Sequence, residues 1–171
     1  MAGHDIVRRV MGIDPGTVKM GYGVVKDGET LAMLDCGVIT AMPDTPLSIR
    51  LQHMYSHLFT IITRCHPDEI AIEQPFMAKN ARSALAVGRA EAVAMLAAAG
   101  NNIPVYSYTP RQVKMMVTSY GAAGKEQVRQ MVKMQLDLAE IPGTSDTADA
   151  LAVAICHIGQ TRLAKMVEMS E

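Results

Sequence analysis

The order of strand-like and helix-like segments is the strongest constraint on how this chain can fold. Three strand patterns come first with no helix between them, and two more follow, each after a helical pattern. The strands are predicted at 7–13, 21–26, 31–39, 69–73 and 105–108. Strands joined by turns pair antiparallel, whereas strands joined through a helix pair parallel. We therefore expect a five-stranded mixed sheet.

Helical patterns fill most of the remaining chain. Between 46 and 65, apolar residues recur at steps of three and four, which is typical of an amphipathic helix. Further helices are predicted at 82–99, 110–117, 125–138 and 145–165. With 171 residues, of which 49% are hydrophobic, the chain fits one domain with a substantial core. The prediction is a single α/β domain over residues 1–171, with helices on both faces of the sheet.

Acidic residues stand at the ends of predicted elements that are otherwise apolar. Asp14 ends the first strand, Glu73 ends the fourth, and Asp146 and Asp149 lie in the first turn of the last helix. That helix is apolar nearly all round from 148 to 155, so it should pack against the sheet. Packing would carry its two acids toward the strand ends.

Each acid also has an ordinary structural interpretation. Asp14 suits a turn, Glu73 suits the surface end of a strand, and Asp146 with Asp149 suits a helix cap. Four carboxylates brought together, however, repel one another unless cations intervene. Mg²⁺ prefers such oxygen ligands, and two ions about 4 Å apart can support phosphodiester hydrolysis. Taken together, the acids favour a metal-dependent nuclease site.

Positive charge is concentrated in the middle of the chain, although the net charge is only −1. Eight basic residues and two acidic ones lie between Lys79 and Lys133. One interpretation is a set of solvated helix faces, and the other is a surface that binds nucleic acid.

Five motifs, in order, carry a resemblance to a known family. They are Met11–Thr17 (MGIDPGT), Ala71–Asn80 (AIEQPFMAKN), Arg111–Lys114 (RQVK), Ala123–Lys125 (AGK) and Asp146–Ala152 (DTADALA). Over residues 7–158 the chain resembles the RuvC family of Holliday-junction resolvases. The resemblance implies a ribonuclease H-like fold, a homodimer, and Mg²⁺-dependent paired symmetric nicking of four-way DNA junctions, in strands of like polarity, during recombination and repair.

The resemblance also implies roles for particular residues. The catalytic, metal-binding acids would be Asp14, Glu73, Asp146 and Asp149, holding two Mg²⁺ ions for which Mn²⁺ can substitute. Phe76 matches a ring placed near the junction bases, and Lys114 and Lys125 match basic residues near the scissile phosphate. From its chemistry alone, Phe76 could stack on a base or plug the core. Lys79 and Arg82 suit contacts to the DNA backbone.

The sequence also suggests partner proteins and a cellular location. The resemblance implies a branch-migration motor of the RuvA and RuvB type as a partner. Without an 18-residue apolar run or a signal peptide, we expect a cytoplasmic protein that does not enter a membrane. Small residues at Ala84, Ala86, Ala90, Ala94 and Ala97 would permit close helix packing, but the sequence does not identify the dimer interface.

Other functions also fit parts of the sequence. The Asp14–Thr17 turn occurs in ATPases of the actin and sugar-kinase type, which need two such domains. A related nuclease acting on structured RNA, or a non-catalytic junction-binding protein, would share the same fold. His53 and His57 have metal-ligand spacing, but Met54 stands where a zinc protease needs Glu. We therefore expect a packed helix there.

Overall fold

A computed structural model describes residues 7–74 and 81–170 and confirms the mixed sheet. The strands are β1 (Arg8–Asp14), β2 (Lys19–Asp27), β3 (Ala32–Thr40), β4 (Glu69–Glu73) and β5 (Val105–Tyr108). Their order across the sheet is β3-β2-β1-β4-β5. The β1–β2 and β2–β3 pairs are antiparallel, and the β1–β4 and β4–β5 pairs are parallel. The centre of the sheet is therefore β1, whose middle residues are fully buried.

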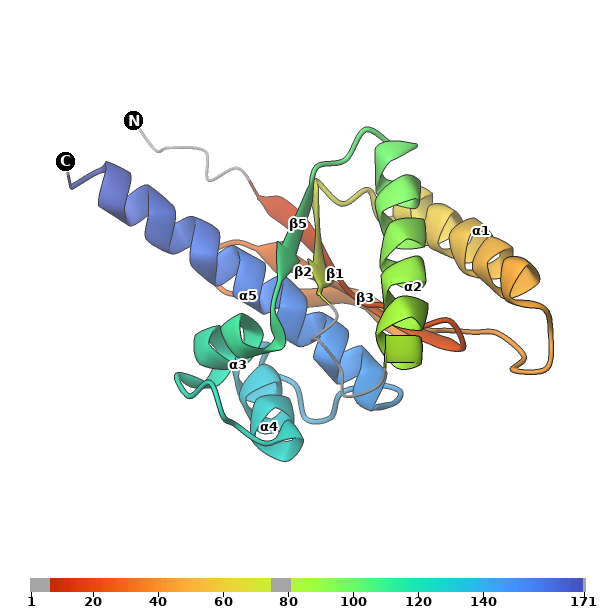
Figure 1. Ribbon diagram of the computed structural model, residues 1–171. Coiled ribbons are helices and arrows are strands. Elements are labelled where there is room, and N and C mark those ends of the chain that lie inside the picture. Colours follow the sequence, from red (N-terminus) through yellow and green to blue (C-terminus); the bar gives the residue numbers. More distant parts are fainter. Residues whose placement is uncertain (1–6, 75–80, 171) are drawn as a thin grey trace.

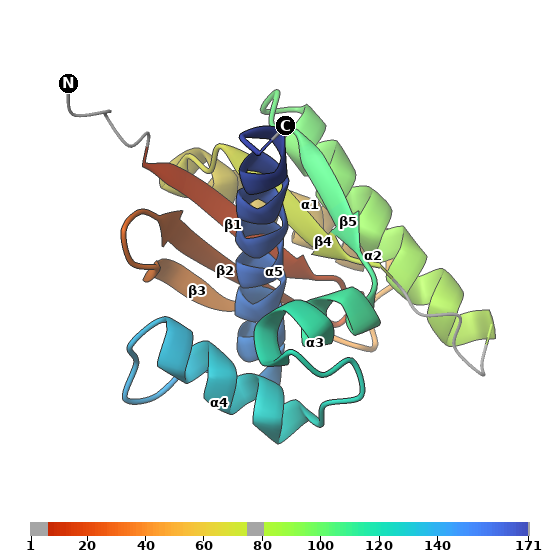
Figure 2. The same ribbon diagram turned by 90° about the vertical axis from the view of Figure 1, so that its left-hand side faces the viewer.

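Helices cover both faces of the sheet, as predicted. They are α1 (Leu47–Cys65), α2 (Ala81–Ala99), α3 (Pro110–Thr118), α4 (Lys125–Gln135) and α5 (Ser145–Glu168). One face carries α1 and α2, while α5 crosses the other with α3 and α4 beside it (Figure 1). The turned view shows α5 running along the sheet in front of β1 (Figure 2). Each face has its own apolar core.

Two helix ends differ from the sequence prediction. The helix expected to reach residue 138 ends at Gln135, and Asp137 adopts a left-handed backbone with φ of 50°. A left-handed residue interrupts the helical hydrogen-bond ladder, and Asp is among the few side chains that tolerate it. The last helix continues beyond residue 165 to Glu168, and its final turns are exposed.

Glycines in β1 and β2 let α5 approach the sheet closely. A Cβ atom built on Gly12 would lie 2.0 Å from the carbonyl oxygen of Ala150, and one on Gly21 would lie 2.1 Å from that of Asp146. A Cβ on Gly23 would lie 2.6 Å from the Leu151 side chain. Such distances are shorter than any real contact, so only glycine permits this helix position. The glycines thus set the height of α5 above the strands.

A buried polar network fixes α5 farther along its length. His157 is fully buried, and its ring nitrogens lie 2.6 Å from the Tyr108 hydroxyl and 2.7 Å from a Glu69 oxygen. Burial lowers the pKa of His157, which favours the neutral ring. Arg8 then donates to Glu69 and to Asp27 at 2.9 and 2.8 Å. Because these partners lie on four strands, the network sets the rotation of α5 as well as its position.

Candidate active site

The four predicted acids gather at one end of the sheet. Asp14 and Glu73 end β1 and β4, which are parallel neighbours, so both side chains reach the same edge. Asp14 also pairs across the sheet with Gly21, against which the Asp146 backbone packs. Asp149 lies one turn farther along α5. Two strand ends and one helix start therefore bring the acids together.

The charges of these acids act on one another. Burial, followed by the charges of Glu73, Asp149 and Asp146, raises the pKa of Asp14 to about 7. Burial and the charge of Asp149 likewise raise the pKa of Glu73 to about 7. Carboxylates shift in this direction when they are held together without enough positive charge nearby. The cluster is thus an electrostatically strained site that a cation would stabilise.

Lys125 provides part of the missing positive charge. Its ammonium group lies 3.3 Å from an Asp149 oxygen, and the charge of Asp149 raises the pKa of Lys125. Asp146 accepts a hydrogen bond of 2.7 Å from the Thr144 hydroxyl. Over residues 7–74 and 81–170, no three His, Cys, Asp or Glu side chains are arranged closely enough to hold a metal. Lys125 thus neutralises Asp149 directly.

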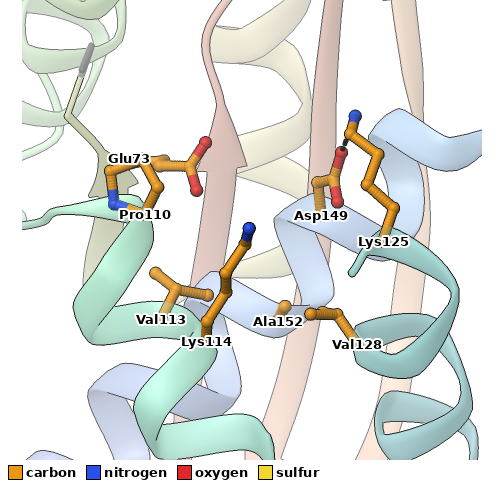
Figure 3. A pocket seen from close by; sticks show the side chains of 8 residues that line it. All are labelled: Glu73, Pro110, Val113, Lys114, Lys125, Val128, Asp149 and Ala152. Atoms are coloured by element: carbon orange, nitrogen blue, oxygen red, sulfur yellow. Dashed lines mark hydrogen bonds and ion pairs between the residues drawn. The ribbon is translucent and has the colours of Figure 1, made fainter. Parts of the chain in front are cut away.

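A pocket of about 180 Å³ opens beside the acids. Its lining includes two acids, Glu73 and Asp149, two lysines, Lys114 and Lys125, and the apolar side chains of Val113 and Val128. In Figure 3 the Lys114 amine points into the space between the two acids, and a dashed line joins Lys125 to Asp149. The pocket thus presents two carboxylates and two ammonium groups, which suits a ligand with phosphate oxygens and a bound cation.

Local sequence signals position the two lysines. α3 starts with a capping box in which Thr109 and Gln112 bond each other's backbone N–H groups, and Pro110 occupies the first turn. Lys114 follows on this firmly started helix. Lys125 is the first residue of α4, directly after Gly124. Both helix starts therefore face the acidic end of the sheet.

Arg82 is the remaining predicted DNA-contacting residue that lies among the described residues. Arg82 is exposed in the first turn of α2 and does not line the pocket. Phe76 and Lys79 lie outside the described residues, as does Pro75. Of the predicted contacts that fall within residues 7–74 and 81–170, Lys114 and Lys125 are the ones beside the acids.

The supporting role of Gly12, Gly21 and Gly23 was not predicted from the sequence. Their side-chain position faces α5, and larger residues there would push the helix and its two acids away. A signal was present, because Gly21 and Gly23 are two residues apart in a strand and therefore face the same side.

Known proteins of one family are similar in sequence to nearly the whole of this chain. The family model "Crossover junction endodeoxyribonuclease RuvC" matches residues 10–157. The RuvC protein of Pelotomaculum thermopropionicum is 51% identical over 149 residues, which cover 86% of this chain and 91% of that protein. The RuvC protein of Dehalococcoides mccartyi strain BAV1 is 43% identical over 164 residues, covering 95% of this chain and 98% of the relative.

Solved structures share the fold. Thermus thermophilus RuvC in complex with a Holliday junction substrate superimposes with a TM-score of 0.87 at 34% identity, covering 92% of this chain and 96% of that one. The yeast mitochondrial Holliday junction resolvase Ydc2 superimposes with a TM-score of 0.66 at 15% identity, covering 94% and 83%. The ribonuclease H-like fold expected from the sequence is thereby confirmed. Among the described residues, no helix is long and apolar enough to cross a membrane.

Proposed function

Because this chain belongs to the RuvC family of crossover junction endodeoxyribonucleases, we propose that it cuts four-way DNA junctions by paired symmetric nicks during recombination and repair. A single nuclease domain over residues 1–171 would carry out this reaction. The observation that carries this proposal is the acidic end of the sheet, where two lysines face mutually repelling carboxylates. A phosphodiester is the substrate for which such a combination is suited.

Divalent metal dependence is general in this family, and the donor set of this chain fits two Mg²⁺ ions, with Mn²⁺ as a substitute. Asp14, Glu73, Asp146 and Asp149 would hold them, because carboxylate oxygens match the preference of a hard cation. The metal-free cluster also needs positive charge, since the pKa values of Asp14 and Glu73 are both raised. Bound metal would supply an activated water and stabilise the leaving oxygen.

The basic residues bind and orient the DNA. Lys114 and Lys125 would neutralise phosphate oxygens in the pocket, where Lys125 now neutralises Asp149. Arg82, in the first turn of α2, and Lys79 would hold the backbone and fix the position of the junction. Phe76, three residues past Glu73, would stack on an exposed junction base.

Two related cuts require two related sites, which a symmetric dimer provides. Three of the five small residues that would permit close packing on α2, namely Ala90, Ala94 and Ala97, are buried in the core of the protein itself and are not available to a partner. The outward face of α2 instead carries Leu85 and Leu96, which are 55% and 63% exposed. We propose that this face forms the dimer interface.

We also propose that a branch-migration motor of the RuvA and RuvB type is a partner of the dimer.

The central test is cutting of a synthetic four-way junction in Mg²⁺ by the wild-type protein and an Asp149→Asn variant. Loss of a metal ligand is expected to reduce the cutting rate by at least about 100-fold. The exposed residue Asp44 provides a matched control, because it is not among the residues that line the pocket and Asp44→Asn should cut normally.

The result also separates the alternatives. Equal cutting by wild type and Asp149→Asn would remove the proposed site, while junction binding without nicking would indicate a non-catalytic protein. A structured RNA of similar size, tested in parallel, distinguishes a resolvase from an RNA-processing nuclease. Melting curves of both variants establish that any loss is not due to unfolding.

A further inference from the structure

Two histidines on α1 form a second cluster of metal-ligating side chains, separate from the acidic pocket. His53 and His57 are one helical turn apart, and their ring centroids lie 4.0 Å apart. Both line a hollow of about 570 Å³ beside β2 and β3, on the face of the sheet opposite α5. The helix packs as expected through Met54 and Leu58, whereas His57 is exposed and His53 is half-buried.

Backbone carbonyl groups orient both rings. His53 Nε2 lies 3.0 Å from the carbonyl oxygen of Thr40, and His57 Nδ1 lies 2.9 Å from that of His53. A carbonyl oxygen can only accept, so each of these ring nitrogens must carry the proton. In the neutral rings the lone pairs are then on His53 Nδ1 and His57 Nε2. Metal-binding histidines are oriented in this way, with the second ring N–H donated to a carbonyl.

From this geometry we propose that His53 and His57 form a binding site for a borderline transition-metal ion of the Zn²⁺ class. Zn–N bonds of about 2.0–2.1 Å that meet at a tetrahedral angle place two ligating nitrogens about 3.3 Å apart. The two rings have centroids 4.0 Å apart and planes 37° apart, so their side chains would have to rotate to turn both free nitrogens toward one ion. The spacing of four residues on one helix face is the spacing of the paired zinc ligands in the motif H-E-x-x-H. Imidazole nitrogen suits Zn²⁺, Cu²⁺ and Ni²⁺, whereas Mg²⁺ prefers oxygen, so the site is chemically distinct from the acidic cluster.

The surroundings leave room for water to complete the coordination. Tyr22, Ser56 and Thr60 also line the hollow. The one cation in its lining, Arg64, forms an ion pair with Asp35, which neutralises its charge. Since the described residues contain no group of three ligating side chains, the ion would keep two or more water molecules or accept a ligand from another molecule.

The test is a Zn²⁺ titration of tag-free protein against a competing chromophoric chelator, with Mg²⁺ in large excess to occupy the acidic site. His53→Asn and His57→Asn should each weaken Zn²⁺ binding by more than about tenfold, because a single imidazole loses the chelate. His66→Asn is the matched control. His66 is an exposed histidine at the end of the same helix with φ of 48°, a conformation that Asn also adopts.

If His53→Asn and His57→Asn both bind Zn²⁺ as tightly as the wild type does, the proposal is wrong. Loss of binding in Cys65→Ser instead would also overturn it, by assigning the ion to the thiol near Asp35, where sulfur and oxygen lie 3.4 Å apart. A second measurement guards against misfolding. Zn²⁺ should raise the melting temperature of the wild type and of His66→Asn, because ligand binding stabilises the folded state by mass action. It should not raise the melting temperature of His53→Asn or His57→Asn.

Discussion

At the residue scale, Asp14 links the site to the stability of the fold. Its ordinary pKa of 3.8 is raised to about 7, and that of Glu73 is raised from 4.5 to about 7. At pH values between the ordinary and the raised pKa of these two carboxyl groups, the folded protein binds more protons than the unfolded chain. Stability therefore falls as pH rises from about 4 to 7, and the full penalty remains above that range. Bound cations would remove this penalty.

We predict that Asp14→Asn stabilises the metal-free protein. At pH 8 the melting temperature should rise by about 2–6 °C, because the substitution removes one of the repelling charges. The gain should shrink toward pH 5, where Asp14 in the wild type is already protonated. Calorimetry in EDTA across pH 5–8 measures both effects. A lower melting temperature at pH 8, or an equal gain at Asp44→Asn, would contradict the clustered arrangement.

The position of the four acids at one end of the sheet could be predicted from the sequence, because each stands at the end or the start of an apolar element. Asp14 and Glu73 end strands that become parallel neighbours, and Asp146 and Asp149 begin an apolar helix. The ion pair between Lys125 and Asp149 could not be predicted in the same way. It depends on how α4 packs beside α5, and no local sequence pattern predicts that packing.

At the scale of elements, the glycines of β1 and β2 decide where the first turn of α5 lies. The sequence showed that this helix had to pack on the sheet, but it did not show how closely. The closeness comes from backbone atoms of α5 lying directly over Gly12 and Gly21. Residues far apart in the chain make these contacts, so their effect appears only when the sheet and the helix are assembled.

Gly21→Ala is predicted to damage the site from beneath. The new methyl group would lie 2.1 Å from the Asp146 carbonyl oxygen, which belongs to a backbone that cannot move without shifting the helix. We expect a loss of stability of about 1–3 kcal/mol and at least about a tenfold fall in the junction-cutting rate. Thermal melting and single-turnover cutting measure these effects.

Gly28→Ala provides the control for this change. Gly28 lies in the turn between β2 and β3, and the nearest described atom to an added Cβ is 3.7 Å away, an ordinary contact distance. Its stability and cutting rate should match those of the wild type. Normal cutting by Gly21→Ala would mean that the height of α5 does not control the position of its acids.

At the scale of the whole molecule, the acidic site and the proposed dimer face are carried by different layers. The acids lie where α5 meets the strand ends, whereas α2 belongs to the helices on the other face (Figure 2). Leu85, Ala92 and Leu96 are exposed and separated by seven and four residues, so they share one side of α2. A Cβ on Gly88 would have no described atom within 4 Å, which leaves room for a partner helix. Substitutions on α2 can therefore separate assembly from chemistry.

Leu96→Glu is predicted to break the dimer while leaving the acidic pocket intact. A charge at the centre of an apolar interface loses hydration without gaining a partner, so dissociation should increase by at least about tenfold. Sedimentation velocity measures the mass, and cutting of a junction labelled on two strands measures whether the nicks remain paired. Leu163→Glu, a similarly exposed leucine on α5, should stay dimeric and nick both strands. If Leu96→Glu sediments as a dimer, the interface lies elsewhere. If a proven monomer still makes paired nicks, the two cuts do not need the two-fold assembly.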